Sequence, residues 1–207
     1  MTRTLSGGMA QFIVGSTQTA FTVHTELLCN CSPYFKQRLT NQHAPTTTMP
    51  LINLQAISPD ICPEIFTEFL RWMYLGILFD DVDITNKMFL PKLWVLAETF
   101  QISELQHAVV SLYRGITNEA REAVIIEPPA IDYIYAHTPA NSSLRLLAVE
   151  TWARHATTAE FSMHRGGLPR PFLGDLCCAL IAGRSEVDSF HDELVSSGNS
   201  CSSVWLW

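Results

Sequence analysis

The chain has 207 residues, enough for one medium domain or for a small domain with an extension. Hydrophobic residues make up 47% and charged residues 16%, so a packed core is readily supplied. The formal net charge is −7, and the 13 Lys and Arg are scattered, with never three in a row. A chain of this kind has no general attraction to phosphate backbones, and we expect no nucleic-acid binding.

The apolar stretches are too short to cross a membrane. The most apolar one, 172–183, has about a dozen residues and contains Asp175, whereas a membrane span needs roughly 20 apolar residues. Residues 1–11 lack the layout of a secretory signal and do not resemble an Arg-rich transit peptide. The six cysteines fit reduced, mostly buried thiols. We therefore expect an intracellular protein of the cytoplasm, the nucleus or both, with no membrane partner.

Short strands come first in the chain. Residues 1–9 are short and polar and carry glycine, and we expect them to be flexible. Residues 12–14 are an apolar run, 15–18 are turn-forming, and 20–23 alternate in polarity. This pattern predicts two strands joined by a tight turn, followed by a short helix at 24–31.

A serine–proline pair then predicts the start of a second short helix. Ser32 can cap the helix and Pro33 can occupy its first turn, ahead of helical residues 34–39. The polar stretch 40–50 indicates a loop, and the apolar run 51–54 predicts a third strand.

Helical spacing of apolar residues dominates the next part of the chain. Three stripes carry it: Ile65, Phe66, Phe69, Leu70 and Met73 in a helix that stops near Gly76; Leu93, Leu96, Ala97 and Phe100; and Leu105, Ala108, Val109 and Leu112. A small strand group followed mostly by helices predicts the α+β fold class.

The second half shows the same spacing with less specific patterns. After a break at 115–129, a helix is expected at 131–139, and another begins after Ser142 or Ser143, either of which can cap it. A last amphipathic segment covers 168–182. These apolar faces must bury against the first half of the chain or against a partner.

Six fragments in a fixed order resemble the signature of the BTB/POZ family. They are Phe21-Thr22-Val23-His24, Leu27-Leu28, Ser32-Pro33-Tyr34-Phe35, Ile52-Asn53-Leu54, the helix from Phe66 through Tyr74 to Gly76, and the stretch from Leu93 to Phe100. The resemblance implies a small mixed sheet flanked by helices, with a C-terminal helical extension. It also implies a protein–protein interaction module for homo- or hetero-association, a scaffold or adaptor. Residues 93–98 and 134–139, running into 143–145, resemble the fungal members.

These patterns divide the chain into four parts. We expect a flexible N-terminus at 1–9, a BTB/POZ-like domain at 10–115, a helical extension at 116–184 and a disordered tail at 185–207. The tail is rich in serine and carries an abrupt apolar stretch at 204–207. Two interpretations of that stretch stay open, a short hydrophobic docking peptide or an altered or shortened reading frame.

Two departures from the family pattern bear on partners. Members that exchange an N-terminal strand have a longer apolar lead-in than residues 1–10, which argues against a strand-swapped dimer. Members that recruit cullins often carry a hydrophobic-x-Glu motif in the loop before the third strand, and the matching stretch 39–49 contains no Glu. A homodimer remains one expected form of association. A substrate adaptor of a cullin-type ubiquitin ligase remains the alternative function.

His24, Cys29 and Cys31 are the residues to weigh as catalytic groups or metal ligands. A closed zinc site needs four ligands, usually in two pairs, and no second pair lies nearby. A lone His lacks the partners that catalysis requires, so we interpret His24 as structural, bonding backbone groups at a strand–helix junction. We predict no enzyme and no catalytic residue, cofactor or metal site. A small metal- or thiol-dependent enzyme is the remote alternative.

The family signature separates structural residues from partner-contact residues. The resemblance implies structural roles for Phe21, His24, Leu27, Leu28, Ser32, Tyr34, Phe35, Tyr74 and Gly76. Trp72 lies off the face of the apolar stripe, and it is either an exposed interface anchor or packed against the C-terminal helices. The predicted partner-contact residues are Thr25, Glu26, Cys29 and Trp72.

Overall fold

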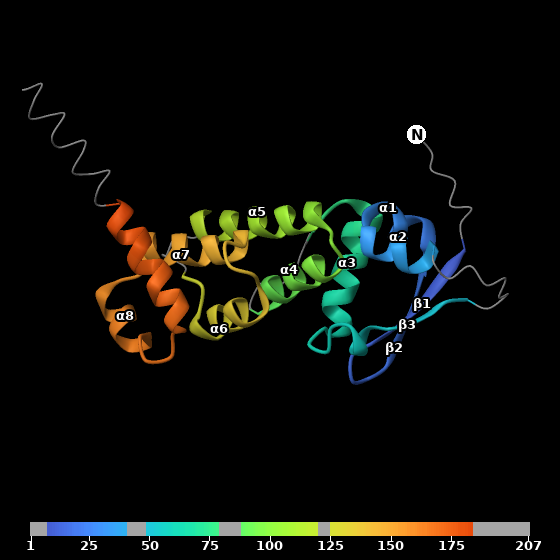
Figure 1. The fold of residues 1–207 in the computed structure, drawn as a ribbon, viewed down its shortest axis with the longest axis horizontal. Coiled ribbons are helices and arrows are strands. Elements are labelled where there is room, and N and C mark those ends of the chain that lie inside the picture. Colours follow the sequence, from blue (N-terminus) through green and yellow to red (C-terminus); the bar gives the residue numbers. More distant parts are fainter. Residues whose placement is uncertain (1–7, 41–48, 79–87, 120–124, 184–207) are drawn as a thin grey trace, which may run out of the picture.

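The computed structural model describes residues 8–40, 49–78, 88–119 and 125–183. The described elements begin with a strand pair, two short helices and a third strand, and they continue with helices alone. Figure 1 shows an elongated molecule with the strands at one end and the last helices at the other. The predicted α+β class, a small mixed sheet flanked by helices and followed by a helical extension, is confirmed.

Within the described residues the sheet has three strands in the order β2-β1-β3. Strand β1 (Met9–Val14) pairs antiparallel with β2 (Thr19–His24) and parallel with β3 (Leu51–Asn53), which makes the sheet mixed. The turn between the first two strands places Gly15 in the left-handed region, at φ 72°, and the Gln18 N–H donates to the Gly15 carbonyl at 3.1 Å.

Two predicted strand boundaries were wrong. Strand β1 begins at Met9, inside the part expected to be flexible, because Met9 pairs with His24 and every second residue from Ala10 is buried. The apolar run at 12–14, on which the prediction was based, covers only the second half of this alternating strand. The third strand ends at Asn53, whose side chain accepts the Gln55 N–H at 3.0 Å and starts a short 3-10 helix, η1 (Leu54–Ala56).

The serine–proline corner between the first two helices has the predicted form. Helix α1 (Thr25–Cys31) has Ser32 as its C-cap, and α2 (Pro33–Thr40) begins at the proline. The Phe35 N–H donates to Ser32 Oγ at 3.2 Å, which is the expected cap. The same hydroxyl donates to the Phe100 carbonyl at 2.6 Å, which fastens the corner to the end of a distant helix.

Five phenylalanines from the sheet and three helical regions form the centre of the first core. Helix α3 (Pro63–Leu75) contributes two of them, and α4 (Phe89–Thr99) leads to a third. Each is fully buried, and neighbouring ring centroids lie 4.5 to 5.6 Å apart. Such aromatic contacts add to the stabilisation that burial alone provides. The five are Phe12, Phe35, Phe66, Phe69 and Phe100.

The helices of the second half pack back onto the first. Helix α5 (Ser103–Glu119) ends the first half, and the helices of the second half are α6 (Pro128–His137), α7 (Ser143–His155), α8 (Thr158–His164) and a helix at 170–183. Helix α7 contacts α5, and α6 contacts α4 (Figure 1). The buried residues of the two halves belong to one hydrophobic core. The Trp152 indole N–H, buried in this core, donates to the Ile126 carbonyl at 2.8 Å. None of the helices in the described ranges is both long and apolar enough to span a bilayer.

Candidate interaction surface

Helix α1 is held on the core by one face and presents the other outward. Leu27 and Leu28 are buried, whereas Glu26 and Cys29 are half-buried and Asn30 is exposed. This division follows helical spacing, because the two leucines lie together on the side that meets the core. Two of the residues predicted to contact a partner, Glu26 and Cys29, are therefore partly accessible to solvent.

Thr25, the third of these residues, is already engaged within the chain. Its hydroxyl donates to the Gly8 carbonyl at 2.7 Å, and its backbone N–H donates to the same carbonyl at 2.9 Å. The half-buried threonine thus fixes the chain ahead of β1.

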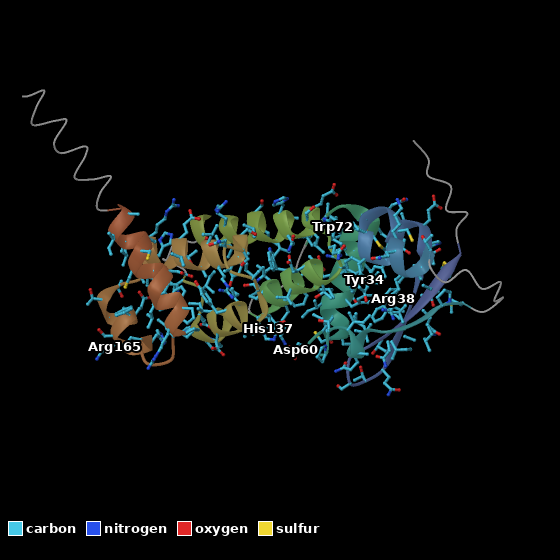
Figure 2. The ribbon with its side chains drawn as sticks, in the orientation of Figure 1. Tyr34, Arg38, Asp60, Trp72, His137 and Arg165 are labelled. Carbon is cyan, nitrogen blue, oxygen red and sulfur yellow. The ribbon has the colours of Figure 1, made fainter. Side chains whose placement is uncertain are left out.

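A hollow of about 470 Å³ lies between α1, the end of α3 and the start of α5. Trp72, labelled in Figure 2, is half-buried on its wall. The sequence left open whether this tryptophan is exposed or packed against later helices. In the structure it is half-buried, beside α1 and the start of α5. The hollow is lined by Leu27, Asn30, Cys31, Trp72, Met73, Gly76 and Glu104.

His24 and Tyr74 form a side-chain pair at the rim of this region. His24 Nδ1 lies 2.7 Å from the Tyr74 hydroxyl, and the His24 backbone N–H donates to that hydroxyl at 3.3 Å. The expected bond from the ring to backbone groups of the junction was wrong, since the helix start receives no side-chain cap from His24. The ring instead connects the end of β2 with the end of α3.

Two further signature residues, Phe21 and Tyr34, pack against the phenylalanine core, and a third, Gly76, ends α3. Phe21, half-buried on β2, has its ring centroid 5.1 Å from that of Phe66. Tyr34 stacks on Phe100 at 6.0 Å and accepts a hydrogen bond from Arg38 Nη1 at 3.0 Å. Gly76 ends α3 in the left-handed region, at φ 74°, which is the backbone conformation that favours glycine at a helix end.

The cysteines are less buried than predicted: of the five in the described part of the chain, Cys29, Cys31 and Cys62 are half-buried and Cys177 and Cys178 are exposed. Burial raises the pKa of Cys31 to about 11, and it also raises the pKa of Cys29. The Cys31 thiol donates to the Leu28 carbonyl at 3.5 Å. Across the described ranges, no group of three or more His, Cys, Asp or Glu side chains is placed to hold a metal ion.

Sequence reasoning missed a polar cluster where the first half meets the extension. His137 on α6 lies 3.5 Å from the Asp60 carboxylate, and its ring stacks on Tyr133 at 4.1 Å. Both His137 and Asp60 are labelled in Figure 2. The Lys92 ammonium lies 5.9 Å from the Tyr133 ring. Burial, with the nearby Asp60 charge, raises the pKa of Tyr133 to about 12. These residues are far apart in the sequence, so no linear pattern marks the cluster.

The family match covers the sheet, α1 to α4 and most of α5. The BTB/POZ domain family matches residues 10–114, and the chain belongs to this family. BTB domains are protein-interaction modules that mediate homo- or hetero-association, and the family is not enzymatic. No curated protein matches the chain.

Two solved structures to which the chain is similar are BTB domains. One is the BTB (Tramtrack and Bric a brac) domain of human Gigaxonin, 16% identical, with 50% of this chain and 75% of that chain covered and a TM-score of 0.38. The other is the BTB domain of zebrafish PATZ1, 16% identical, with coverage of 51% and 74% and a TM-score of 0.37.

Proposed function

We propose that this chain mediates protein association through the outward side of α1 and the adjoining hollow. This surface, the α1 surface, is defined by Thr25, Glu26, Cys29, Asn30 and Trp72. The observation that carries the proposal is a half-buried tryptophan on the wall of a hollow between three helices. Tryptophan at such a site gains further burial when a partner binds, which is why it is frequent among interface anchors.

The proposal is tested by measuring mass across concentrations. Light scattering coupled to size-exclusion chromatography shows whether the chain self-associates up to high micromolar concentration. If it does, Trp72→Ala is expected to shift the equilibrium toward monomer. Leu75→Ala is the matched control, because Leu75 is an exposed apolar residue of α3 that does not line the hollow.

A hetero-partner requires a different readout. If the wild-type chain is a strict monomer, homodimerisation is excluded, and proximity labelling in cells is the test that remains. Partners that the wild-type and Leu75→Ala chains label and the Trp72→Ala chain does not would support the α1 surface. Identical partner sets for all three chains, with Trp72→Ala folded, would contradict it.

We also propose the cullin-adaptor role as the alternative. Its support is membership in a family of interaction modules together with a helical extension that packs on the domain. The stretch 39–49 has no Glu, which counts against it, and residues 41–48 lie outside the described ranges. The last 90 or so residues would have to recognise the substrate. A pull-down with purified cullin that recovers none of the chain would remove this alternative.

The thiol-enzyme alternative is opposed by the chemistry of the cysteines. A nucleophilic cysteine needs a lowered pKa, and burial raises that of Cys31 to about 11. We therefore propose structural roles for His24 and Cys31. Full folding and unchanged partner binding of a His24→Ala, Cys29→Ser, Cys31→Ser variant, with no bound metal on elemental analysis, would dismiss the alternative.

Three finer assignments are also proposals. The first is the division into a domain at 10–115 and an extension at 116–184. This boundary lies inside α5, so the two units would share that helix. Limited proteolysis tests whether they separate there. The proposed tail at 185–207 lies outside the described residues, as do residues 1–7. The assignment to the fungal branch of the family rests on residues 93–98 and 134–139.

The compartment and the absence of nucleic-acid binding stay predictions from the sequence. Imaging checks the first, and a gel-shift assay checks the second.

A further inference from the structure

The last helices of the chain enclose an apolar groove far from the α1 surface. The end of α7, α8 and the helix at 170–183 form its walls around a volume of about 470 Å³. Pockets that enclose a small ligand span roughly 300–1,000 Å³. The groove is lined chiefly by Trp152, Ala156, Phe161, Leu173, Leu176 and Leu180.

The groove offers apolar surface and few hydrogen-bonding groups. Phe161 is 38% exposed and Leu180 is 47% exposed, so large apolar side chains on two of its walls are open to solvent. Thr157 also lines the groove, but its hydroxyl is already bonded to the Glu160 carboxylate at 2.7 Å in the capping box of α8. This chemistry fits an apolar or aromatic peptide rather than a polar small molecule.

The chain itself carries such a peptide after the helix at 170–183 in the sequence. Val204, Trp205, Leu206 and Trp207 are an unbroken apolar stretch with two indole side chains. Leu180 of the groove wall lies three residues before the end of the described helix at Gly183, and residues 184–203 link that point to the stretch. A link of 20 residues spans up to about 70 Å when extended, so its length allows the stretch to reach the groove.

We propose that the 204–207 stretch binds in this groove within the same chain. Tethering raises the effective concentration of a linked segment to the millimolar range, so a contact that is weak between separate molecules becomes occupied. Tryptophan is also the side chain that gains most from filling an apolar pocket. The stretch would then cover the exposed apolar side chains that α8 and the last helix present.

A peptide-competition experiment tests the proposal. The probe is a fluorescently labelled synthetic peptide with the sequence of residues 200–207, and its anisotropy reports binding. We expect the peptide to bind a chain that lacks residues 204–207 at least roughly ten-fold more tightly than the full chain, because the tethered copy competes in the full chain. The same peptide with both tryptophans replaced by serine is expected not to bind.

Two matched substitutions locate the binding site. Leu180 lines the groove, whereas Leu146 is 60% exposed on α7 and does not line it. In the shortened chain, Leu180→Asp is expected to abolish peptide binding and Leu146→Asp to leave it unchanged. Circular dichroism and thermal unfolding of both variants establish that a lost signal is not lost folding.

Three outcomes would overturn the proposal. The first is no peptide binding to the shortened chain. The second is equal affinity for the shortened and full chains, which would mean that the stretch does not occupy the groove in cis. The third is a mass of the full chain that grows with concentration and returns to monomer when residues 204–207 are removed, which would place the stretch in the groove of another copy.

Discussion

The His24 imidazole and the Tyr74 hydroxyl meet at 2.7 Å although the two residues lie 50 positions apart. The hydroxyl also accepts the His24 backbone N–H at 3.3 Å, so its own proton is available to Nδ1 when the ring carries its proton on Nε2. Two residues of the family signature thus fasten the start of α1 to the end of α3, beside the α1 surface.

Removing the Tyr74 hydroxyl is expected to weaken this connection without disturbing the ring contact. Tyr74→Phe should lower the free energy of unfolding by about 0.5–1.5 kcal/mol, the usual net value of a lost hydrogen bond. Urea denaturation of Tyr74→Phe, His24→Ala and the double variant measures the coupling. Additive effects in this cycle would show that the pair does not interact in solution.

Ser32→Ala is expected to be more damaging, because one buried hydroxyl serves two distant segments. It caps α2 through the Phe35 N–H and satisfies the Phe100 carbonyl. A lost cap costs about 1 kcal/mol, and a buried carbonyl left without its partner costs about 1–3 kcal/mol. We therefore expect a loss of about 2–4 kcal/mol in urea denaturation. Ser16→Ala, in the exposed hairpin turn, should stay within about 0.5 kcal/mol of wild type.

The sequence predicted the helices and strands that carry a dense apolar pattern, and it missed helix α8, which carries none. Helix α8 has no buried side chain, and its Met163 is 75% exposed, so periodicity gave no signal there. A local signal did exist. Thr157 and Glu160 have the spacing of a capping box, and the structure contains that box, with the Thr157 N–H donating to the carboxylate at 2.7 Å.

The candidate surface was harder to predict than the fold. The outward residues of α1 follow from helical spacing, but the hollow combines Asn30, Met73 and Glu104 from three helices. No pattern along the chain marks residues that tertiary packing alone brings together. For the same reason the signature pointed to His24 and Tyr74 separately but not to their bond.

Raising the pH is expected to destabilise the protein through Cys31. The unfolded thiol loses its proton near pH 9, whereas burial keeps the folded thiol protonated up to about pH 11. Between these values the unfolded chain binds fewer protons, so the free energy of unfolding falls as pH rises through that window. Denaturation from pH 8 to pH 11 should show a shallower fall for Cys31→Ala than for wild type. Cys177→Ala, at an exposed position, is the control for the loss of a cysteine side chain.

Arg145, in the first turn of α7, holds the end of α6 in place. Its guanidinium donates to the Tyr135 carbonyl at 2.9 Å and to the Thr138 hydroxyl at 3.1 Å, and it lies 4.4 Å from the Tyr135 ring. Lysine cannot reproduce this planar set of donors, so Arg145→Lys should cost about 1–2 kcal/mol. Arg154→Lys, at an exposed ion pair with Glu150, should cost less than about 0.5 kcal/mol. Equal losses in thermal unfolding would contradict this.

Two glycines with open space around them are expected to respond to alanine in opposite directions. A Cβ at Gly76 or Gly115 would meet no atom within 4 Å, so neither substitution creates a clash. Gly76 ends α3 at φ 74°, where a side chain is strained, and Gly76→Ala should cost about 1 kcal/mol. Gly115 lies inside α5, where alanine is the better helix former, and Gly115→Ala should stabilise by about 0.5–1 kcal/mol. Urea denaturation of both variants gives the two signs directly, and a shift in the same direction for both would show that backbone conformation is not what distinguishes these positions.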